Sequence, residues 1–392
     1  MSMVWPAVPL GKVVQHRKEF ITIDDTGTYR RPRVQLHAQG IVQRDEVPGA
    51  LIKTKQQQVC RAGEFLVAEI DAKVGGFGIV PDSLDGTIVS SHYFLFGIDE
   101  TKLDRRFLDY FIRTPTFREQ VEAQGSTNYA AIRPAHVLGY TLPLPELAEQ
   151  RRVVARIEEL AGRVDEARTL RYQAATEAEA LVQNSIATVI TKNWPVVPLE
   201  QTVDPERPIT YGIVQAGDHI PDGVPYIRVS DMAKPQLTTV GMLRTSPQIA
   251  ARYRRSAVHE GDLVFAIRAT VGKMRFVPNQ LDGANLTQGT ARIAPSKVAL
   301  APYLYWVLRS REVADSIQAA TKGSTFKEIT LGRLRTIPVP LAPIPAQRRI
   351  SAELDGLQSQ VDSVRREQAA TETELDALLP AILDRAFKGE LV

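Results

Sequence analysis

Asp71 and Lys73 have the residue types and spacing found at the end of a metal-dependent nuclease site, which an upstream acid such as Glu46 would complete. Such tripeptides are common by chance, and a second copy of the surrounding pattern reads Arg268-x-Thr270 at these positions. We therefore favour a solvated strand end here. A stand-alone metal-dependent nuclease stays open as an alternative.

Other catalytic signatures are missing from the sequence. It contains neither a Gly-x-x-x-x-Gly-Lys-Ser/Thr phosphate loop nor a Gly-x-Ser-x-Gly elbow, and Gly75-Gly76-Phe77-Gly78 is predicted to form a turn. The six histidines show no His-x-x-x-His pairing, and Cys60 is the only cysteine, so neither a metal site nor an internal disulfide is expected. These observations predict a chain that is not itself an enzyme.

The elements that would position binding residues occur twice. Gln150-Arg151-Arg152 returns as Gln347-Arg348-Arg349, 197 positions later, and the same shift carries Leu84-Asp85-Gly86 onto Leu281-Asp282-Gly283. With one inserted residue, Gly125-Ser126-Thr127 falls on Gly323-Ser324-Thr325. This internal repeat predicts a pseudo-two-fold molecule, suited to a partner that carries two separated sites.

Each copy begins with a globular part that we predict to be α+β. Strands are expected over Glu64–Ile70, Val224–Val229 and Asp262–Ile267, and helices over Leu103–Ala123 and Pro302–Ala319. Each part opens with a Trp-Pro phrase, at Trp5 and Trp194. Each closes with alternating prolines, at 143–145 and 338–345, which we expect to continue neither a sheet nor a helix.

A long amphipathic helix is predicted after each globular part. The a/d positions of the two runs are Val153, Ile157, Leu160, Val164 and Ala167, and Ile350, Leu354, Leu357, Val361 and Val364. The first run extends to about Ile190, and Pro380 should break or kink the second. We expect the two helices to pair antiparallel as a coiled-coil spacer. The alternative is that each folds back on its own domain.

These patterns predict four segments: a globular domain over 1–145, a helix over 146–191, a second domain over 192–343, and a helix with a C-terminal tail over 344–392. The second globular part is the most basic, with 18 basic and 12 acidic residues over 193–340, whereas 341–392 has 6 and 9. An acidic helix is a better protein-docking surface than a DNA binder. The start of the chain shows no signal-peptide pattern, so a cytoplasmic location is expected.

The sequence resembles the specificity subunits of type I restriction–modification enzymes over essentially its whole length. The phrases that carry the resemblance are Leu142-Pro143-Leu144-Pro145 with Glu149-Gln150-Arg151-Arg152, Ile337-Pro338-Val339-Pro340 with Gln347-Arg348-Arg349-Ile350, Gly212-Ile213-Val214-Gln215, Gly223-Val224-Pro225-Tyr226-Ile227-Arg228-Val229, and the ending from Leu378 to Leu391. Their order and duplication are specific to the family.

The resemblance implies two target-recognition domains that each read half of an interrupted DNA sequence, with the paired helices setting the gap. It also implies two docked methyltransferase (modification) subunits, which hold S-adenosylmethionine and methylate adenine at N6, and restriction–translocase subunits that can join them. No cofactor is expected on this chain itself. A non-DNA helical scaffold is the remaining alternative.

Arginine can bridge guanine, asparagine or glutamine can bridge adenine, and basic side chains neutralise phosphates. On this basis the predicted DNA-binding residues of the first domain are Arg30, Arg31, Arg33, Arg44, Lys53, Lys55, Ser91, His92, Asn128 and Tyr129. Those of the second are Tyr211, Arg228, Arg252, Arg254, Arg255, Arg268, Lys273, Thr287, Gln288, Lys322, Thr325 and Lys327. For any single basic residue, a solvated surface charge is the competing interpretation.

Overall fold

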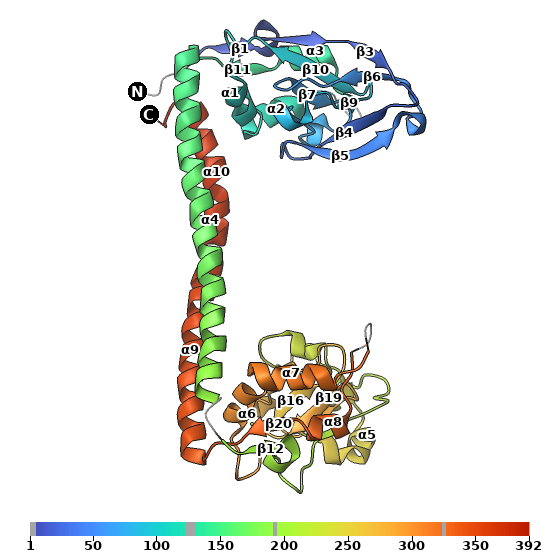
Figure 1. Cartoon of the computed structure of the whole chain (residues 1–392), viewed down its shortest axis with the longest axis vertical. Coiled ribbons are helices and arrows are strands. Elements are labelled where there is room, and N and C mark those ends of the chain that lie inside the picture. The colour runs from blue at the N-terminus through green and yellow to red at the C-terminus, as the bar shows by residue number, and fades with distance from the viewer. Residues whose placement is uncertain (1–4, 123–130, 191–193, 324–326, 392) are drawn as a thin grey trace. The chain divides into compact units, whose positions relative to one another are not determined.

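The computed structural model describes residues 5–122, 131–190, 194–323 and 327–391. The chain divides into two compact units (Figure 1): unit 1 comprises Met1–Arg171 and Ala369–Val392, and unit 2 comprises Tyr172–Gln368. The longest helix, α4 (Leu147–Ile190), contributes its first part to unit 1 and its second part to unit 2. Within the described residues, no helix is long and apolar enough to cross a bilayer.

Unit 1 is built on a four-stranded antiparallel sheet of order β2-β10-β7-β8. Its strands elsewhere form a three-stranded sheet, β3-β6-β9, and two pairs, β1-β11 and β4-β5. The strands are β1 (Ala7–Pro9), β2 (Val14–Arg17), β3 (Phe20–Thr22), β4 (Thr28–Val34), β5 (Ile41–Pro48), β6 (Gln56–Val59), β7 (Phe65–Ala68), β8 (Phe77–Ile79), β9 (Ile88–Val89), β10 (Tyr93–Ile98) and β11 (Thr141–Pro143). The helices are α1 (Arg105–Phe111), α2 (Pro115–Glu122), α3 (Pro134–Gly139) and α10 (Glu372–Phe387), besides α4.

Unit 2 repeats this plan with a four-stranded sheet of order β13-β19-β16-β17, a three-stranded sheet β15-β14-β18 and a pair β12-β20. Its strands are β12 (Val196–Pro198), β13 (Thr210–Tyr211), β14 (Val224–Ile227), β15 (Arg244–Thr245), β16 (Leu263–Ala266), β17 (Met274–Phe276), β18 (Asn285–Leu286), β19 (Thr290–Ile293) and β20 (Pro338–Pro340). Its helices are α5 (Pro247–Arg252), α6 (Ala301–Val307), α7 (Arg311–Ala320), α8 (Leu331–Arg335) and α9 (Ile344–Ala370). The predicted α+β class and the three predicted strands are therefore confirmed, with shorter bounds.

The β4–β5 hairpin is an addition to this plan and lies at one side of unit 1 (Figure 1). Its loop rests on Gly75, because the His37 and Ala38 amides donate to the Val74 and Gly75 carbonyls at 2.7 and 2.9 Å. A Cβ on Gly75 would lie only 2.7 Å from the Ala38 nitrogen, and its φ of +80° also favours glycine. The turn predicted over Gly75–Gly78 is therefore confirmed only at Gly75, where it also has a packing role, because Phe77 and Gly78 belong to strand β8.

The two helices predicted over Leu103–Ala123 and Pro302–Ala319 are each two shorter helices, α1 and α2, and α6 and α7. The hydroxyls of Thr114 and Ser310 donate to the carbonyls three residues earlier, both at 2.7 Å, and so end the first helix of each pair. In unit 1, Pro115 also disfavours a helical conformation for Thr114. The hydrophobic spacing was correct, but it cannot reveal a break of three residues.

Pro143, Pro338 and Pro340 lie in strands, and Pro345 lies in the first turn of helix α9, contrary to our expectation. Val8 pairs with Leu142 and Val197 with Val339, so each Trp-Pro entry forms a two-stranded ribbon with the proline-rich exit. Proline is tolerated because these ribbons have only two strands, so one edge of each needs no ladder hydrogen bond. The ribbon joins the beginning and the end of each globular part.

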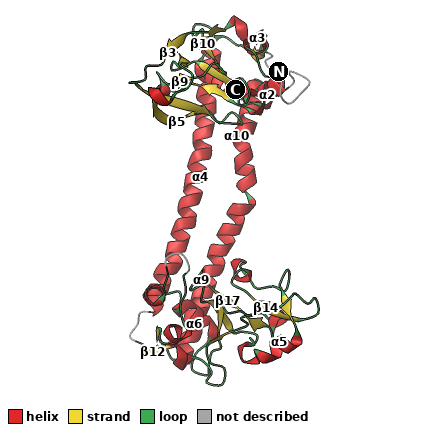
Figure 2. Cartoon of the chain, turned by 90° about the vertical axis from the view of Figure 1, so that its right-hand side faces the viewer, coloured by secondary structure: helices red, strands yellow, loops and turns green. Residues whose placement is uncertain are grey.

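In each unit, part of α4 lies beside a C-terminal helix (Figure 2). In unit 1, Val153 and Ile157 share a core with Leu383 and Ala386 of α10, and Arg168 pairs with Asp376 at 3.0 Å. This order makes the two helices antiparallel. In unit 2, Ile186 of α4 shares a core with α9, and Arg365 pairs with Glu179 at 2.6 Å. Each unit therefore contains both helix–helix packing and packing of the helices on the globular part.

Two predictions about the second helical run need correction. Pro380 lies inside α10, which continues to Phe387, so the helix does not break there, and a kink at Pro380 stays a prediction; the interruption falls at Thr371, between α9 and α10. A proline removes one backbone hydrogen bond, and this helix continues without it. Val364, predicted to lie in the seam, is exposed, whereas Ile350, Leu354 and Val361 are buried.

The glutamine of each Gln-Arg-Arg phrase is fully buried. Gln150 accepts from the Asp104 amide at 2.8 Å and donates to the carbonyls of Lys102 and Pro145 at 2.8 and 2.9 Å. Gln347 makes the same three contacts with the Leu300 amide and the carbonyls of Val298 and Ala342, at 2.8, 2.8 and 2.7 Å. These side chains join the start of each long helix to the loop before α1 or α6.

Candidate nucleic-acid interface

Three of the predicted residues of unit 1, Arg31, Arg44 and Lys53, line one concavity of about 370 Å³. Its apolar lining includes Pro32, Leu51, Ile52, Ile88, Val89 and Tyr93, and its polar lining Thr54, Gln57 and Ser90. The concavity lies between the β4–β5 hairpin and the segment that leads into β6. The concavity therefore combines apolar walls with basic side chains.

Asp45 holds two of these arginines in place. Arg31 donates to both of its carboxylate oxygens at 2.8 Å, and the Arg44 Nε donates at 3.0 Å. The hydrogen bonds from Arg31, the largest cause, and from Arg44 lower the pKa of Asp45 from its ordinary value. The carboxylate therefore stays charged and fixes the direction of both guanidinium groups beside the concavity.

Two other predicted basic residues stabilise the hairpin. Arg30 donates to the carbonyls of Ser83 and Asp85 at 3.0 and 2.8 Å, and Lys55 contacts Asp25 and the Gly49 carbonyl. Arg33 is exposed on β4. Arg30 and Lys55 thus have a structural role, and DNA contact by these three residues stays a prediction.

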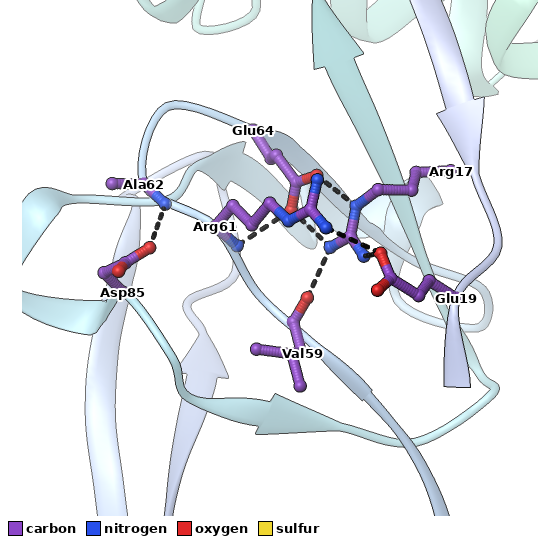
Figure 3. A network of polar contacts seen from close by, with 7 residues as sticks. All are labelled: Arg17, Glu19, Val59, Arg61, Ala62, Glu64 and Asp85. Atoms are coloured by element: carbon purple, nitrogen blue, oxygen red, sulfur yellow. Dashed lines mark hydrogen bonds and ion pairs between the residues drawn. The ribbon is translucent and has the colours of Figure 1, made fainter. Parts of the chain in front are cut away.

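A polar network supports the turn that precedes β7 (Figure 3). Glu64 is nearly buried and accepts from Arg17 Nη2 at 2.8 Å and from the Arg61 amide at 2.9 Å, while Asp85 accepts from the Ala62 amide at 2.8 Å. The hydrogen bond to Glu64 is the largest cause of a raised pKa for Arg17. The network therefore fixes the beginning of strand β7.

Unit 2 has the same network at the start of β16. Asp262 accepts from Arg207 Nη1 at 3.1 Å and from the His259 amide at 2.8 Å, and Asp282 accepts from the Glu260 amide at 3.0 Å. The bond from Glu260, followed by that from His259, lowers the pKa of Asp282. The strands β7 and β16 are thus held alike. We call the C-terminal end of each of these strands, with the loop before the neighbouring strand β10 or β19, the edge of the unit.

At this edge of unit 1 lie the predicted residues Ser91 and His92, in the loop before β10. The His92 ring approaches Glu69 at 2.7 Å, and Arg133 approaches the same carboxylate at 3.3 Å. Glu69 follows β7, and Arg133 precedes α3. Arg133 was not among the predicted residues, because it shares no sequence cluster with other basic residues.

The same edge of unit 2 gathers several predicted residues. Arg268 follows β16, Thr287 and Gln288 precede β19, and Lys322 and Lys327 lie between α7 and α8. Glu328 joins them, because it pairs with Arg268 at 2.9 Å and its backbone bridges to Lys322. Ala269, with a φ of +59°, donates to the Lys327 carbonyl at 2.9 Å. A strained non-glycine residue of this kind is typical of functional loops.

The remaining predicted residues of unit 2 have different surroundings. Arg228 is held by Asp231 at 2.8 and 3.0 Å, and Thr287 donates to the Ile227 carbonyl at 3.2 Å, which places the two segments side by side. Arg252, Arg254 and Arg255 are exposed at the end of α5 and in the turn after it, which lies next to β13 and the exposed Tyr211. Lys273 is half-buried. Asn128, Tyr129 and Thr325 lie outside the described residues.

The nuclease hypothesis receives no support from the geometry. Asp71 begins a 3₁₀ turn, and its carbonyl accepts from the amides of Val74 and Gly76. Glu46 lies on β5, opposite Arg30. Among the described residues, no three histidine, cysteine or acidic side chains are grouped closely enough to hold a metal ion.

Comparison with known proteins gives a consistent picture. A family model described as "Type I restriction modification DNA specificity domain" matches residues 214–372. The type I restriction enzyme EcoBI specificity subunit of Escherichia coli is 26% identical over 321 residues, which cover 75% of this chain and 67% of that protein. The EcoKI specificity subunit of Escherichia coli strain K12 is 21% identical over 308 residues, covering 73% and 65%.

Two solved structures are similar over nearly the whole chain. The HsdS subunit from Thermoanaerobacter tengcongensis has a TM-score of 0.67 and 27% identity, with 99% of this chain and 97% of that chain covered. A chain from a structure described as underlying complex assembly and conformational transition of the type I R-M system has a TM-score of 0.76 and 28% identity, with 98% of each chain covered.

Proposed function

The chain belongs to the family of type I restriction–modification specificity subunits, and on that premise we propose that each unit reads one half of an interrupted double-stranded DNA target. The observation that carries this proposal is that the same edge of both four-stranded sheets presents different side chains. His92 and Arg133 lie there in unit 1, and Arg268 and Lys327 in unit 2. The β4–β5 hairpin and its concavity add a surface that belongs to unit 1 alone. Two units with similar backbone folds and different exposed side chains suit a DNA target whose two halves differ in sequence.

We also propose the four-segment organisation, with globular domains over 1–145 and 192–343, in which α4, α9 and α10 form the spacer that sets the gap between the half-sites. The exposed Leu170, Tyr172 and Leu181 on α4 would help these helices dock two methyltransferase subunits. In this proposal the reaction belongs to the partners, which bind S-adenosylmethionine and methylate adenine at N6. Restriction–translocase subunits would join the same complex.

The proposal predicts that this chain decides which adenines are methylated. Mapping of methylated adenines in cells that express the methyltransferase partner, with and without this chain, should show a single interrupted sequence only when the chain is present. Exchange of the unit 2 edge, by Arg268→Ala with Gln288→Ala, should change the sequence of one half-site and leave the other unchanged. Methylation of the same sites without the chain would contradict the proposal.

The basic side chains of the unit 2 edge should make the binding of the assembled complex sensitive to salt. The logarithm of the binding constant falls with the logarithm of salt concentration by about 0.9 for each phosphate neutralised. The double variant Lys322→Ala/Lys327→Ala should therefore reduce this slope by about 2. Lys297→Ala, which removes an exposed lysine from another loop of unit 2, is the matched control and should leave the slope unchanged. Equal slopes in all three complexes would exclude this edge from the interface.

A further inference from the structure

Ile70 and Arg268 occupy the same position in the two units. The preceding residues, Glu69 and Ile267, make matching backbone hydrogen bonds to the loops before β10 and β19. The Glu69 amide donates to the His92 carbonyl at 2.8 Å, and the Ile267 amide donates to the Gly289 carbonyl at 2.9 Å. The same residue accepts a second bond, from Ile132 or from Ile329, at 3.1 and 3.0 Å. Two matched backbone hydrogen bonds therefore fix the point at which Ile70 and Arg268 leave the sheet.

The two side chains at this position have opposite chemistry. Ile70 is 73% exposed and lies between two acids, Glu69 and Asp71. Arg268 has 43% of its side chain exposed, and its Nε and Nη2 both bond Glu328 Oε1, at 3.0 and 2.9 Å. Glu328 thus directs the guanidinium, and the Nη1 group has no hydrogen-bond partner among the described residues.

We infer that Ile70 and Arg268 are specificity-determining residues that read a thymine methyl group and a guanine, respectively. The inference rests on the proposed function. The C5-methyl of thymine is the only apolar group that base pairs present in the major groove, so it is the group that an exposed isoleucine at a DNA interface can recognise. An oriented guanidinium suits the N7 and O6 acceptors of guanine.

Basic residues beside Ile70 and Arg268 can bind the phosphate backbone of the DNA while these two side chains read the bases. In unit 1, His92 and Arg133 are both mainly exposed and converge on Glu69, the residue next to Ile70. In unit 2, Lys322 forms a backbone bridge with Glu328, and Lys327 directly precedes Glu328. Phosphate contacts of this kind fix register without reading sequence, so they leave discrimination to the central side chain.

The test uses the assembled methyltransferase complex and synthetic duplexes that carry its mapped target. Each thymine of the target is replaced in turn by deoxyuridine, which removes only the methyl group, and each guanine by 7-deazaguanine, which removes only N7. One deoxyuridine duplex in one half-site should be methylated about fourfold more slowly, as expected for loss of one buried methyl group. One 7-deazaguanine duplex in the other half-site should be methylated about tenfold more slowly.

Variants assign these effects to the two residues. Ile70→Ala should abolish the response to deoxyuridine, and Arg268→Ala the response to 7-deazaguanine, each without changing the other response. Val240→Ala, which shortens an aliphatic residue that is 74% exposed elsewhere in unit 2, should retain both responses. The inference would be overturned if Ile70→Ala kept the response to deoxyuridine. It would also be overturned if the half-site read by unit 1 contained no thymine or that read by unit 2 no guanine. Either result would leave the proposed function standing. Absence of any target-specific methylation would overturn both.

Discussion

Replacement of Gln347 by leucine is expected to lower the free energy of unfolding of the full chain by about 3 kcal/mol. The glutamine satisfies the Leu300 amide and the carbonyls of Val298 and Ala342 with one side chain that is fully buried. Leucine has a similar volume but no polar atom, so three backbone groups lose their partner. Each buried polar group without a partner costs about 1–3 kcal/mol, and partial access of water to this loop places the sum near the lower end.

Hydrogen exchange gives a local measurement of the same effect. The Leu300 amide should exchange much faster in Gln347→Leu, and the Asp104 amide in Gln150→Leu, because these are the two amides that donate to the glutamines. Gln183→Leu provides the control, since Gln183 is exposed on α4 and its replacement should change stability by less than about 0.5 kcal/mol. Unchanged exchange at Leu300 in the Gln347 variant would show that the side chain does not anchor the helix.

These glutamines show what the repeat in the sequence could and could not predict. Duplication of the Gln-Arg-Arg phrase correctly placed the start of two helices near residues 147 and 344. A polar residue at the start of a helix is normally assigned to the surface, however. Burial of Gln150 depends on Lys102 and Asp104, which are 48 and 46 residues away, and periodicity within a helix carries no information about such a contact.

The prediction of DNA-binding residues was also incomplete because it could not include contacts between residues far apart in the sequence. Arg31 was selected for its charge, but its guanidinium is bound by Asp45 across the β4–β5 hairpin, 14 residues away. Arg228 has its partner Asp231 only three residues on, so its pairing could have been suspected from the sequence. Ile70, which we infer to be a base-reading residue, was not among the predicted residues because it carries no charge. The sequence repeat of 197 residues aligned Asp71 with Arg268. The matched backbone hydrogen bonds of Glu69 and Ile267 instead align Ile70 with Arg268, a separation of 198 residues.

The elements that were predicted best are those with a strong local signal. The first part of helix α4 follows from the a/d pattern over 153–167, and β7 and β16 follow from apolar runs between turns. The pairing of β12 with the proline-rich β20 was not predicted, because the local rule against proline in strands gives no information about where an unpaired edge is available. Local chemistry therefore predicted the elements, and long-range contacts decided which side chains are free to bind a partner.

Replacement of Glu64 by alanine is expected to destabilise unit 1 by about 3–5 kcal/mol. The Glu64 side chain is only 7% exposed, and it binds both the Arg17 guanidinium and the Arg61 amide (Figure 3). Its removal leaves the mostly buried charge of Arg17 without its main partner, and an unpaired buried charge is the costly outcome when one member of such a pair is deleted.

Glu19 offers a matched control within the same network. It also pairs with Arg17, at 3.1 Å, and with Arg61, at 2.7 Å, but 56% of its side chain is exposed (Figure 3). Exposed ion pairs contribute about 0–1 kcal/mol, so Glu19→Ala should have a small effect on the urea midpoint of the full chain. Asp262→Ala should reproduce the large effect in unit 2, because Asp262 has 4% exposure and binds Arg207 and the His259 amide. Equal midpoints for Glu64→Ala and Glu19→Ala would mean that burial of the pair does not determine its contribution, and that the turns before β7 and β16 are held by other contacts.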